Sequence, residues 1–566
     1  MKTMKTYSII PLLIILISLG SCTKVADLSE LNPFLKKSIS WKCKTLDTEI
    51  PLKIYYLHDS TDFEGADVII YVKNQAIERI GQESDLPILT DFIREKFIVI
   101  TADFGNNPKA VSPFFDYDLH DIFRGVFGYQ TESLLKDIKL SPKEFRCFIV
   151  PEGYRVATDL VYWELDKHGV YGTLEYIMES YNTDIVPKVP GLKVVSTPGE
   201  MVDRYGKPFD FTVKMDIVYP SQPKRKVPVV FHSETLSARN PNEQPRNNFP
   251  HFGGFLMRGY AYVVMGHCFN PCVNHYFHFG KFELDHWNGF ACYTAGIRYL
   301  NANSDKYNLN TNYIGGIGYS KGEYAITRLS DPNHDGGTES KKYEGFPDGS
   351  PQPQPWPGYS SKISCGMQGM GMGLFETEYI TSDYVPTMIV CGENDRDVIT
   401  RQHPLFVKTL DDLNANYISL LMQGLGHEIP NGYDERMGVD RYLLSVDFFD
   451  RYLRVEEKLP PVVLVTSPIN NKEGVSPDEK ISVHFAPVID EKTVIDNKGI
   501  RVISVKDNTE VEGSWNISNG GTKFNFTPAQ PLKNSEEYKI IISPKIKDKA
   551  GIRMGKEKIV QFKVAS

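Results

Sequence analysis

Residues 191–455 alternate between two hydrophobic patterns. Short, nearly continuous apolar runs are typical of strands buried on both faces, whereas apolar residues three or four positions apart are typical of amphipathic helices. The strand-like runs lie at 209–220, 226–234, 312–320, 385–392 and 416–426, the stretch 254–267 combines a helix end with a further strand, and the helical patterns lie at 285–303 and 439–454. This alternation predicts βαβ units, and therefore a parallel sheet with helices.

The pattern changes after a linker at 456–461 (EEKLPP). Short segments of alternating apolar and polar residues follow, separated by turns rich in Asn, Gly, Asp and Pro. These features are typical of a small antiparallel sandwich. The stretches SPDEKISVHFAPVIDEKTV and FTPAQPLKNSEEYKIIISPKIKDKAG also resemble the bacterial Ig-like domains of surface-layer and secreted proteins. We therefore expect an all-β Ig-like sandwich over residues 462–566, acting as a spacer or a contact module.

The N-terminal region is harder to interpret. Strand-like runs at 51–58, 66–75 and 96–106 predict an accessory α/β region over residues 22–190. The segment 87–106 faintly repeats the pattern of 250–270. A partial duplication of an α/β half-unit and a chance similarity between two helix–strand pairs both explain this repeat.

The first 22 residues predict export. Two lysines precede an apolar stretch that is short for a membrane span, and small residues follow it. Residues 19–22 (Leu-Gly-Ser-Cys) resemble the lipobox of bacterial lipoproteins, which implies a signal peptide at 1–21 and acylation of Cys22. The alternative is ordinary signal cleavage that leaves Cys22 as a thiol. We expect a lipid-anchored protein of the bacterial cell envelope, on the periplasmic or the outer face of the outer membrane.

Bulk composition narrows the function classes. A chain of 566 residues with 41% hydrophobic and 12% aromatic residues is typical of a globular protein of several domains. A net charge of −8 without a long basic run gives no reason to expect nucleic-acid binding. Seven cysteines follow Cys22, an odd and dispersed set that does not suggest a disulfide framework, so we expect most of them to be buried. They are Cys43, Cys147, Cys268, Cys272, Cys292, Cys365 and Cys391.

The segment 313–329 (YIGGIGYSKGEYAITRL) carries a candidate nucleophile. Its Gly-Tyr-Ser-Lys-Gly motif places Ser320 between a strand-like run and a helical segment. This is the context that a G-x-S-x-G nucleophile elbow requires, because flanking glycines allow a sharp turn that exposes the hydroxyl. The motif alone is weak, so an ordinary serine in a Gly-rich loop stays open at this point.

Two residues downstream strengthen the catalytic interpretation. Asp395 follows the strand-like run at 385–392, and His427 follows residues 416–423 in a Gly-rich turn. The order serine, acid, histidine, each beyond the carboxyl end of a strand, is the order that hydrolases of this topology use. Asp397, Glu376 and Glu378 are alternative candidates for the acid.

These motifs resemble those of α/β-hydrolases, most closely the esterase branches with dienelactone hydrolases and acetyl xylan esterases. The matching pieces are GIGYSKG, CGENDRDV and GLGHE. The resemblance implies a doubly wound, mostly parallel sheet over 191–455, and no cofactor or metal. It implies Ser320 as nucleophile, His427 as base and Asp395 as the residue that orients the imidazole.

The resemblance also implies an oxyanion hole. One donor is the backbone N–H of Lys321, directly after the nucleophile. The second donor is expected from Ser233 or Glu234, in the stretch FHSETLS, where family members carry His-Gly. Ser233 stands in place of that glycine, which puts the geometry of the second donor in question.

Three other stretches compete for a role. Residues 266–280 hold His267, Cys268, Cys272, His275 and His278. A zinc site, a local Cys268–Cys272 disulfide and a pocket-lining loop all fit that stretch. The stretch 331–337 (DPNHDGG) suggests calcium but lacks EF-hand spacing, which favours a solvated loop. In the Pro-rich insertion 342–362, Trp356 and Tyr359 either stack on a sugar or hold the loop down.

Together these patterns predict an exported serine esterase that uses a Ser-His-Asp acyl-enzyme mechanism. Its expected substrate is an acylated carbohydrate or another ester, by analogy with envelope hydrolases that carry an added sandwich. The alternatives are a serine peptidase on the same triad and a non-catalytic glycan-binding lipoprotein.

Overall fold

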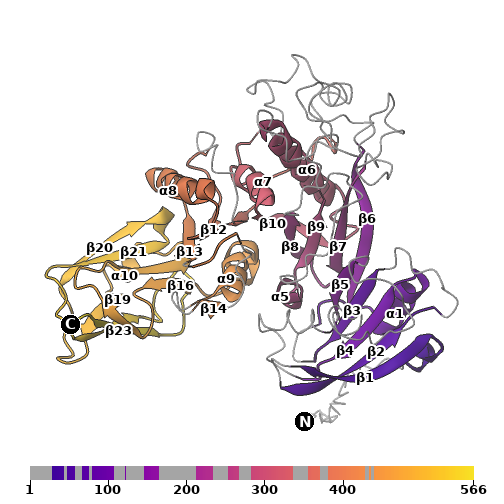
Figure 1. Ribbon diagram of the computed structural model, residues 1–566, viewed down its shortest axis with the longest axis horizontal. Helices are drawn as coiled ribbons and strands as arrows, with labels where there is room; N and C mark the ends of the chain where they lie inside the picture. Colours follow the sequence, from indigo (N-terminus) through magenta and orange to yellow (C-terminus); the bar gives the residue numbers. More distant parts are fainter. Residues whose placement is uncertain are drawn as a thin grey trace, which may run out of the picture.

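The computed structural model describes most of the chain. The described residues are 28–43, 47–57, 67–75, 79–106, 122, 146–164, 212–233, 253–266, 282–334, 355–369, 380–422, 424–427, 433–434 and 439–566. They form an N-terminal unit, a large central sheet and a C-terminal sandwich, arranged side by side (Figure 1). Within these residues, no helix is both long and apolar enough to cross a membrane.

The central sheet has eight strands in the order β13-β12-β11-β10-β8-β9-β7-β6. The strands from β13 to β9 in this order are parallel, whereas β7 and β6 join through antiparallel pairings. Their bounds are β6 (Tyr154–Glu164), β7 (Thr212–Pro220), β8 (Val227–Ser233), β9 (Ala261–Met265), β10 (Leu309–Tyr319), β11 (Cys365–Gly369), β12 (Thr387–Gly392) and β13 (Tyr417–Met422). The sheet is thus mixed but mostly parallel.

Helices cover both faces of this sheet (Figure 1). α5 (Gly253–Met257) and α9 (Arg441–Leu453) pack in one core cluster, and α6 (Phe282–Ala302) and α7 (Lys321–Leu329) pack in another. α8 (Asp397–Asp412) packs against β12 in a smaller cluster. The short strands β14 (Tyr433–Asp434) and β15 (Val439–Asp440) precede α9, and η9 (Val455–Glu457) follows it.

Glycines in β10 bring the helices close to the sheet. A Cβ on Gly315 would lie 2.4 Å from the Phe449 ring, and one on Gly316 would lie 2.8 Å from both Ile326 and Phe231. Because real Cβ atoms do not approach that closely, the sequence Gly-Gly-Ile-Gly is required by close packing on the two faces.

The N-terminal unit is built on a five-stranded sheet in the order β1-β2-β4-β3-β5. β1 and β2 pair antiparallel, as do β2 and β4, whereas β4, β3 and β5 are parallel. The elements are η1 (Leu28–Phe34), β1 (Leu35–Cys43), β2 (Thr48–Tyr55), β3 (Val68–Lys73), α1 (Asp85–Arg94), β4 (Ile98–Asp103) and β5 (Cys147–Pro151).

This order and these directions repeat those of β6-β7-β9-β8-β10 in the central sheet. α1 precedes β4 as α5 precedes β9, and the similar segments 87–106 and 250–270 overlap these two helix–strand pairs. The shared topology favours partial duplication over chance. β6 belongs to the central sheet although it precedes residue 191, so the expected boundary at 190/191 does not coincide with the start of that sheet.

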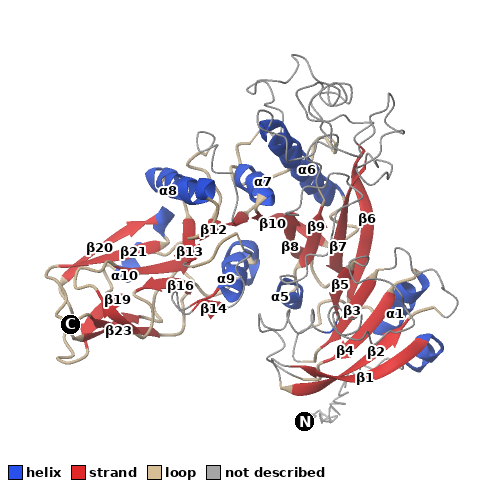
Figure 2. Cartoon of the chain, in the orientation of Figure 1, coloured by secondary structure: helices blue, strands red, loops and turns tan. Residues whose placement is uncertain are grey.

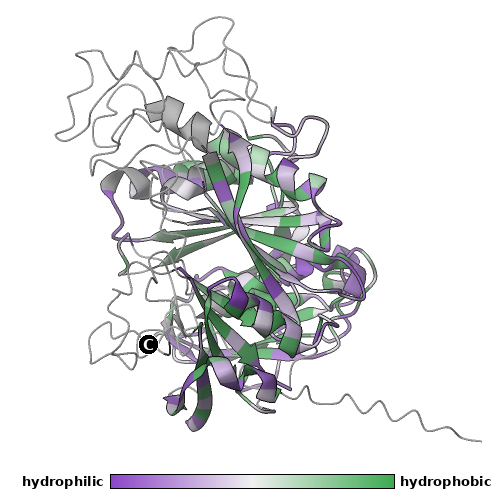
Figure 3. Ribbon diagram, turned by 90° about the vertical axis from the view of Figure 1, so that its right-hand side faces the viewer, coloured by the Kyte–Doolittle hydropathy of each residue, from purple (hydrophilic) through white to green (hydrophobic). Residues whose placement is uncertain are grey.

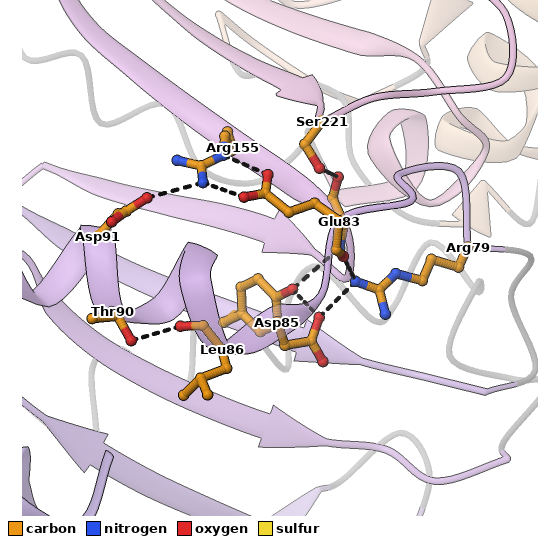
Figure 4. Close-up of polar contacts among 10 residues, drawn as sticks. Arg79, Glu83, Asp85, Leu86, Thr90, Asp91, Arg155 and Ser221 are labelled. Atoms are coloured by element: carbon orange, nitrogen blue, oxygen red, sulfur yellow. Dashed lines mark hydrogen bonds and ion pairs between the residues drawn. The ribbon is translucent and has the colours of Figure 1, made fainter. Parts of the chain in front are cut away.

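Ion pairs join the N-terminal unit to the central sheet. Arg155 on β6 forms ion pairs with Glu83 and, at 3.0 Å, with Asp91 on α1 (Figure 4). Arg146, just before β5, pairs with Asp67 and also reaches Asp216 on β7 at 3.5 Å. These contacts tie the two sheets together at their shared edge.

A second polar cluster lies beside the carboxyl ends of β3 and β5. Asp85 accepts the Tyr71 hydroxyl at 2.7 Å and forms ion pairs with Lys73 at 2.9 Å and Arg79 at 3.0 Å. Burial, with the Asp85 carboxylate nearby, raises the pKa of Glu152 to about 7. The net charge of this cluster therefore changes with pH near neutrality, because Glu152 gains or loses its proton there.

The C-terminal sandwich consists of two four-stranded sheets, β16-β18-β21-β20 and β17-β23-β22-β19 (Figure 2). The inward side chains of both sheets form one apolar core. The bounds are β16 (Val462–Ser467), β17 (Lys472–Val475), β18 (Ile481–Ala486), α10 (Glu491–Val494), β19 (Ile500–Ser504), β20 (Gly513–Ser518), η10 (Asn519–Gly521), β21 (Lys523–Pro528), β22 (Glu537–Ile542) and β23 (Lys558–Val564).

Apolar residues gather on the strands in the interior of the molecule (Figure 3). Five cysteines are buried thiols in the described residues, as expected from their dispersed positions; they are Cys43, Cys147, Cys292, Cys365 and Cys391. Cys268 and Cys272 lie outside the described residues.

Candidate active site

Ser320 lies at a sharp turn between β10 and α7. Its backbone has φ 53° and ψ −122°, a combination that residues other than glycine rarely adopt. The turn is held by a hydrogen bond from the Ser320 N–H to the Gly369 carbonyl at 2.8 Å, and by one from the Glu323 N–H to the Ser320 carbonyl at 3.1 Å. This is the strained geometry of a nucleophile elbow.

The glycine two residues before Ser320 has a steric role. A Cβ on Gly318 would lie 2.4 Å from the carbonyl oxygen of Gly322 and 2.6 Å from Ile326 Cγ1. The first turn of α7 therefore folds back onto β10 so tightly that only glycine fits. The close contact between α7 and β10 thus explains both the glycine at position 318 of the motif and the sharp backbone turn that follows it.

The structure brings the three predicted residues into one hydrogen-bonded chain. His427 Nε2 lies 3.0 Å from Ser320 Oγ, and His427 Nδ1 lies 2.8 Å from Asp395 Oδ1. The Asp395 side chain is fully buried, whereas the His427 side chain is 24% exposed. A buried carboxylate behind a partly exposed imidazole is the arrangement that lets histidine accept a proton and then pass it on.

Backbone contacts fix the acid loop against the histidine loop. The Glu393 N–H donates to the Met422 carbonyl at 2.9 Å, and the Asn394 N–H donates to the Leu425 carbonyl at 2.8 Å. The Glu393 carboxylate in turn accepts the Gly424 N–H at 3.1 Å. These bonds set the distance between the strand ends that carry Asp395 and His427.

Glu393 is a positioning residue that the sequence analysis did not single out. It lies inside the stretch CGENDRDV, two residues before Asp395. Its contact joins residues 31 positions apart, so only the pairing of β12 with β13 brings it to the histidine loop.

A buried polar network lies beneath the elbow helix. Gln368, next to the Gly369 that accepts the Ser320 N–H, donates to the Tyr384 hydroxyl at 2.7 Å. That hydroxyl donates to the Thr327 carbonyl on α7 at 3.0 Å. The network joins α7 to β11 and to the segment before β12, and it supports the elbow from below.

Cys391 is not a competing nucleophile in this site. Burial, with the Asp395 carboxylate nearby, raises the pKa of its thiol to about 12. The thiolate, which is the reactive form, is therefore negligible at neutral pH.

Two of the three candidate oxyanion donors, Lys321 and Ser233, lie within the described residues. Lys321 is the first residue of α7, where a backbone N–H has no partner within the helix. The backbone of Ser233 ends β8 and pairs with Gly318 on β10, beside the elbow. Glu234, the other candidate, lies outside the described residues.

The remaining candidates separate as follows. Asp397 begins α8, and His427 is bonded to Asp395. Glu376, Glu378 and the His/Cys stretch at 267–278 lie outside the described residues. Among the described residues, no group of three or more His, Cys, Asp or Glu side chains is placed to hold a metal ion.

Two of the competing loops have structural contacts. The Asp331 carboxylate accepts the backbone N–H groups of Asn333 at 2.8 Å and of Thr381, in the segment before β12, at 3.0 Å, so it has a structural role. The Trp356 indole donates to the Tyr162 carbonyl at 2.7 Å and packs edge-on against Tyr299. Trp356 therefore holds the described end of the Pro-rich insertion, residues 355–362, against β6 and α6.

Comparison with known proteins identifies the C-terminal module. Residues 457–564 match the family of bacterial Ig-like domains. Together with the two observed sheets, this match confirms the Ig-like sandwich expected at 462–566. No curated protein matches the sequence.

Solved structures match part of the chain at low similarity. A truncated carbohydrate esterase from gut microbiota is 14% identical with a TM-score of 0.31, over 48% of this chain and 99% of that chain. MGS-M1, an α/β hydrolase enzyme from a Medee basin deep-sea metagenome library, is 14% identical with a TM-score of 0.30, over 47% and 100%. Esterase B from Lactobacillus rhamnosis is 13% identical with a TM-score of 0.32, over 55% and 89%. Such values do not transfer a substrate to this chain.

Proposed function

We propose that this protein is a serine esterase of the α/β-hydrolase type. The observation that carries the proposal is the chain of contacts from Ser320 Oγ through His427 to Asp395, at 3.0 Å and 2.8 Å. The strained turn at Ser320 and the mostly parallel sheet support it.

In the acylation step, Ser320 Oγ attacks the ester carbonyl carbon while its proton moves to His427 Nε2. The Asp395 carboxylate accepts a hydrogen bond from the Nδ1–H group and stabilises the imidazolium that forms. The oxyanion is bound by the Lys321 N–H and by a second backbone N–H, from Ser233 or Glu234. The intermediate collapses when the C–O bond to the alcohol breaks and His427 returns the proton to the leaving oxygen.

Deacylation repeats the sequence with water. His427 accepts a proton from a water molecule, and the resulting hydroxide attacks the acyl carbonyl. The tetrahedral intermediate then expels Ser320 Oγ, which recovers its proton from His427. The products are an alcohol and a carboxylic acid, and the enzyme is regenerated.

We further propose an acylated polysaccharide as substrate and lipid anchoring through Cys22 in the bacterial cell envelope. The lipobox-like segment 19–22 supports the anchor, and the appended Ig-like module is consistent with work on an extended glycan. A Cys22→Ser variant should appear in the soluble fraction, whereas the unaltered chain should fractionate with membranes.

The catalytic proposal is tested with a fluorophosphonate probe and chromogenic substrates. We expect labelling of the unaltered chain and of Ser360→Ala, an exposed serine control, and none of Ser320→Ala. The enzyme should hydrolyse p-nitrophenyl acetate but not aminoacyl anilides. Labelling that persists in Ser320→Ala would exclude this serine as the nucleophile, whereas anilide hydrolysis would favour a peptidase.

A further inference from the structure

A cavity of about 460 Å³ lies at the joint between α9 and the Ig-like module. One wall comes from the end of α9 and the linker up to Leu459. The other wall comes from residues 487–488, which follow β18, and from residues 548–552. This volume lies in the range of pockets that hold small organic molecules.

The joint itself is fixed by specific contacts. The Asn519 side chain, buried in η10, donates to the Tyr417 carbonyl at 2.9 Å, and the Gly520 N–H donates to the Asn414 side chain at 3.1 Å. A Cβ on Gly520 would lie only 3.2 Å from Asn416.

Apolar packing continues across the same joint. Leu464 and Ala486 of the sandwich belong to the core cluster that contains Phe448 and Phe449 of α9. An interface with this packing does not open freely, so the cavity is a permanent feature and not a gap between loosely tethered modules.

Apart from two lysines, the charged side chains around the cavity form hydrogen bonds or ion pairs within the chain. Asp450 accepts the Tyr260 hydroxyl at 2.8 Å and pairs with Arg258 and Arg454. Arg451 donates to the Pro460 carbonyl at 2.5 Å. The buried Asp548 carboxylate accepts the Ile552 N–H at 2.8 Å.

Lys458 and Lys549 differ from these groups. Both line the cavity and are exposed, and neither forms an ion pair or hydrogen bond through its side chain within the described part of the chain. They therefore leave two ammonium groups at the rim of the cavity.

The walls between these lysines are largely apolar. They include Val455, which is 52% exposed, together with Leu459, Pro487, Val488 and Ile552. A ligand that suits both features has a carboxylate for the rim and an apolar body for the walls. Inorganic anions satisfy only the rim, and neutral apolar molecules satisfy only the walls.

We propose that this cavity is a binding site for an organic carboxylate with an apolar body, separate from the triad. The triad lies beyond the carboxyl ends of β10, β12 and β13, whereas the Ig-like module contacts the start of β13 at Tyr417. The cavity therefore lies near the amino ends of the strands, opposite the triad, and binding there does not require catalysis.

Calorimetric titration of the full chain with 4-hydroxycinnamate tests the proposal. We expect a dissociation constant of about 2 mM, which corresponds to the modest binding energy per heavy atom that is usual for drug-sized ligands. The double variant Lys458→Gln/Lys549→Gln should weaken binding about five- to tenfold, and Lys472→Gln/Lys545→Gln should not change it. All four lysines are exposed, so both double variants are expected to fold.

Two further ligands distinguish recognition of the carboxylate charge from recognition of the apolar body. The neutral amide of the same acid should bind about tenfold more weakly, and inorganic phosphate should not displace the acid. Equal binding by both double variants would place the acid elsewhere and overturn the proposal. Equal affinity for the neutral amide, or displacement by phosphate, would overturn it as well.

Discussion

Replacing Glu152 by Gln should stabilise the protein at pH 8 and leave its stability unchanged near pH 4. Burial, with Asp85 beside it, raises the pKa of Glu152 from its ordinary 4.5 to about 7. A pKa that is higher in the folded chain means that the folded chain binds the proton more tightly than the unfolded chain. The stabilisation is therefore present below pH 4.5 and is lost as the pH rises to about 7.

The structure sets the size of this effect. The difference between 7 and 4.5 corresponds to about 3 kcal/mol for a carboxyl shielded from water. Glu152 is only partly buried, so solvent screening reduces the expected gain at pH 8 to about 1–2 kcal/mol. At Asp85, burial favours the neutral acid, but Lys73 and the Tyr71 hydroxyl outweigh it and lower the pKa. Asp85 therefore titrates below the pH window of Glu152.

Scanning calorimetry at pH 4 and pH 8 measures the effect. We expect the Glu152→Gln variant to unfold about 2–6 °C higher than the unaltered chain at pH 8 and at the same temperature at pH 4. The control is Glu473→Gln, which changes an exposed carboxylate on β17. An equal change at both pH values, or none at pH 8, would refute the assignment of a raised pKa to Glu152.

Three further predictions concern the proposed active site. Asp395→Asn should lower kcat by about 10³-fold or more with little change in KM. The control variant Asp397→Asn should leave kcat unchanged. If only Asp397→Asn lowered kcat, Asp397 would be the acid of the triad. Gly318→Ala, whose Cβ would lie 2.4 Å from the Gly322 carbonyl, should destabilise the protein by about 2–4 kcal/mol in urea titrations; unchanged stability would contradict the tight turn. Glu393→Ala should lower kcat about three- to tenfold, and Glu393→Gln should restore it; equal loss in both would exclude hydrogen bonding.

The local parts of this structure were predictable from the sequence. The strands that end near Ser320, Asp395 and His427 are apolar runs followed by glycines or polar turns. Such a pattern involves only residues close together in the sequence, so it can be read without knowing the fold. The order serine, acid, histidine then followed from the rule that functional residues gather at the carboxyl ends of parallel strands.

The sequence could not supply contacts between distant segments. The choice between Asp395 and Asp397 depends on which carboxylate reaches His427, and that depends on the pairing of β12 with β13. The similarity of 87–106 to 250–270 was visible, but strand order and direction were needed to favour duplication. β6 was not recognised as part of the central sheet because its partner β7 follows only after 47 intervening residues (165–211).

The docking of the Ig-like module has a consequence for orientation. Asn519 and Gly520 hold the module against Tyr417, the first residue of β13, and against Asn414 just before it, at the end of the sheet opposite the elbow at Ser320. The sandwich and the central sheet therefore turn together as one rigid body. Whatever surface the sandwich contacts therefore sets the orientation of the elbow at Ser320 relative to that surface.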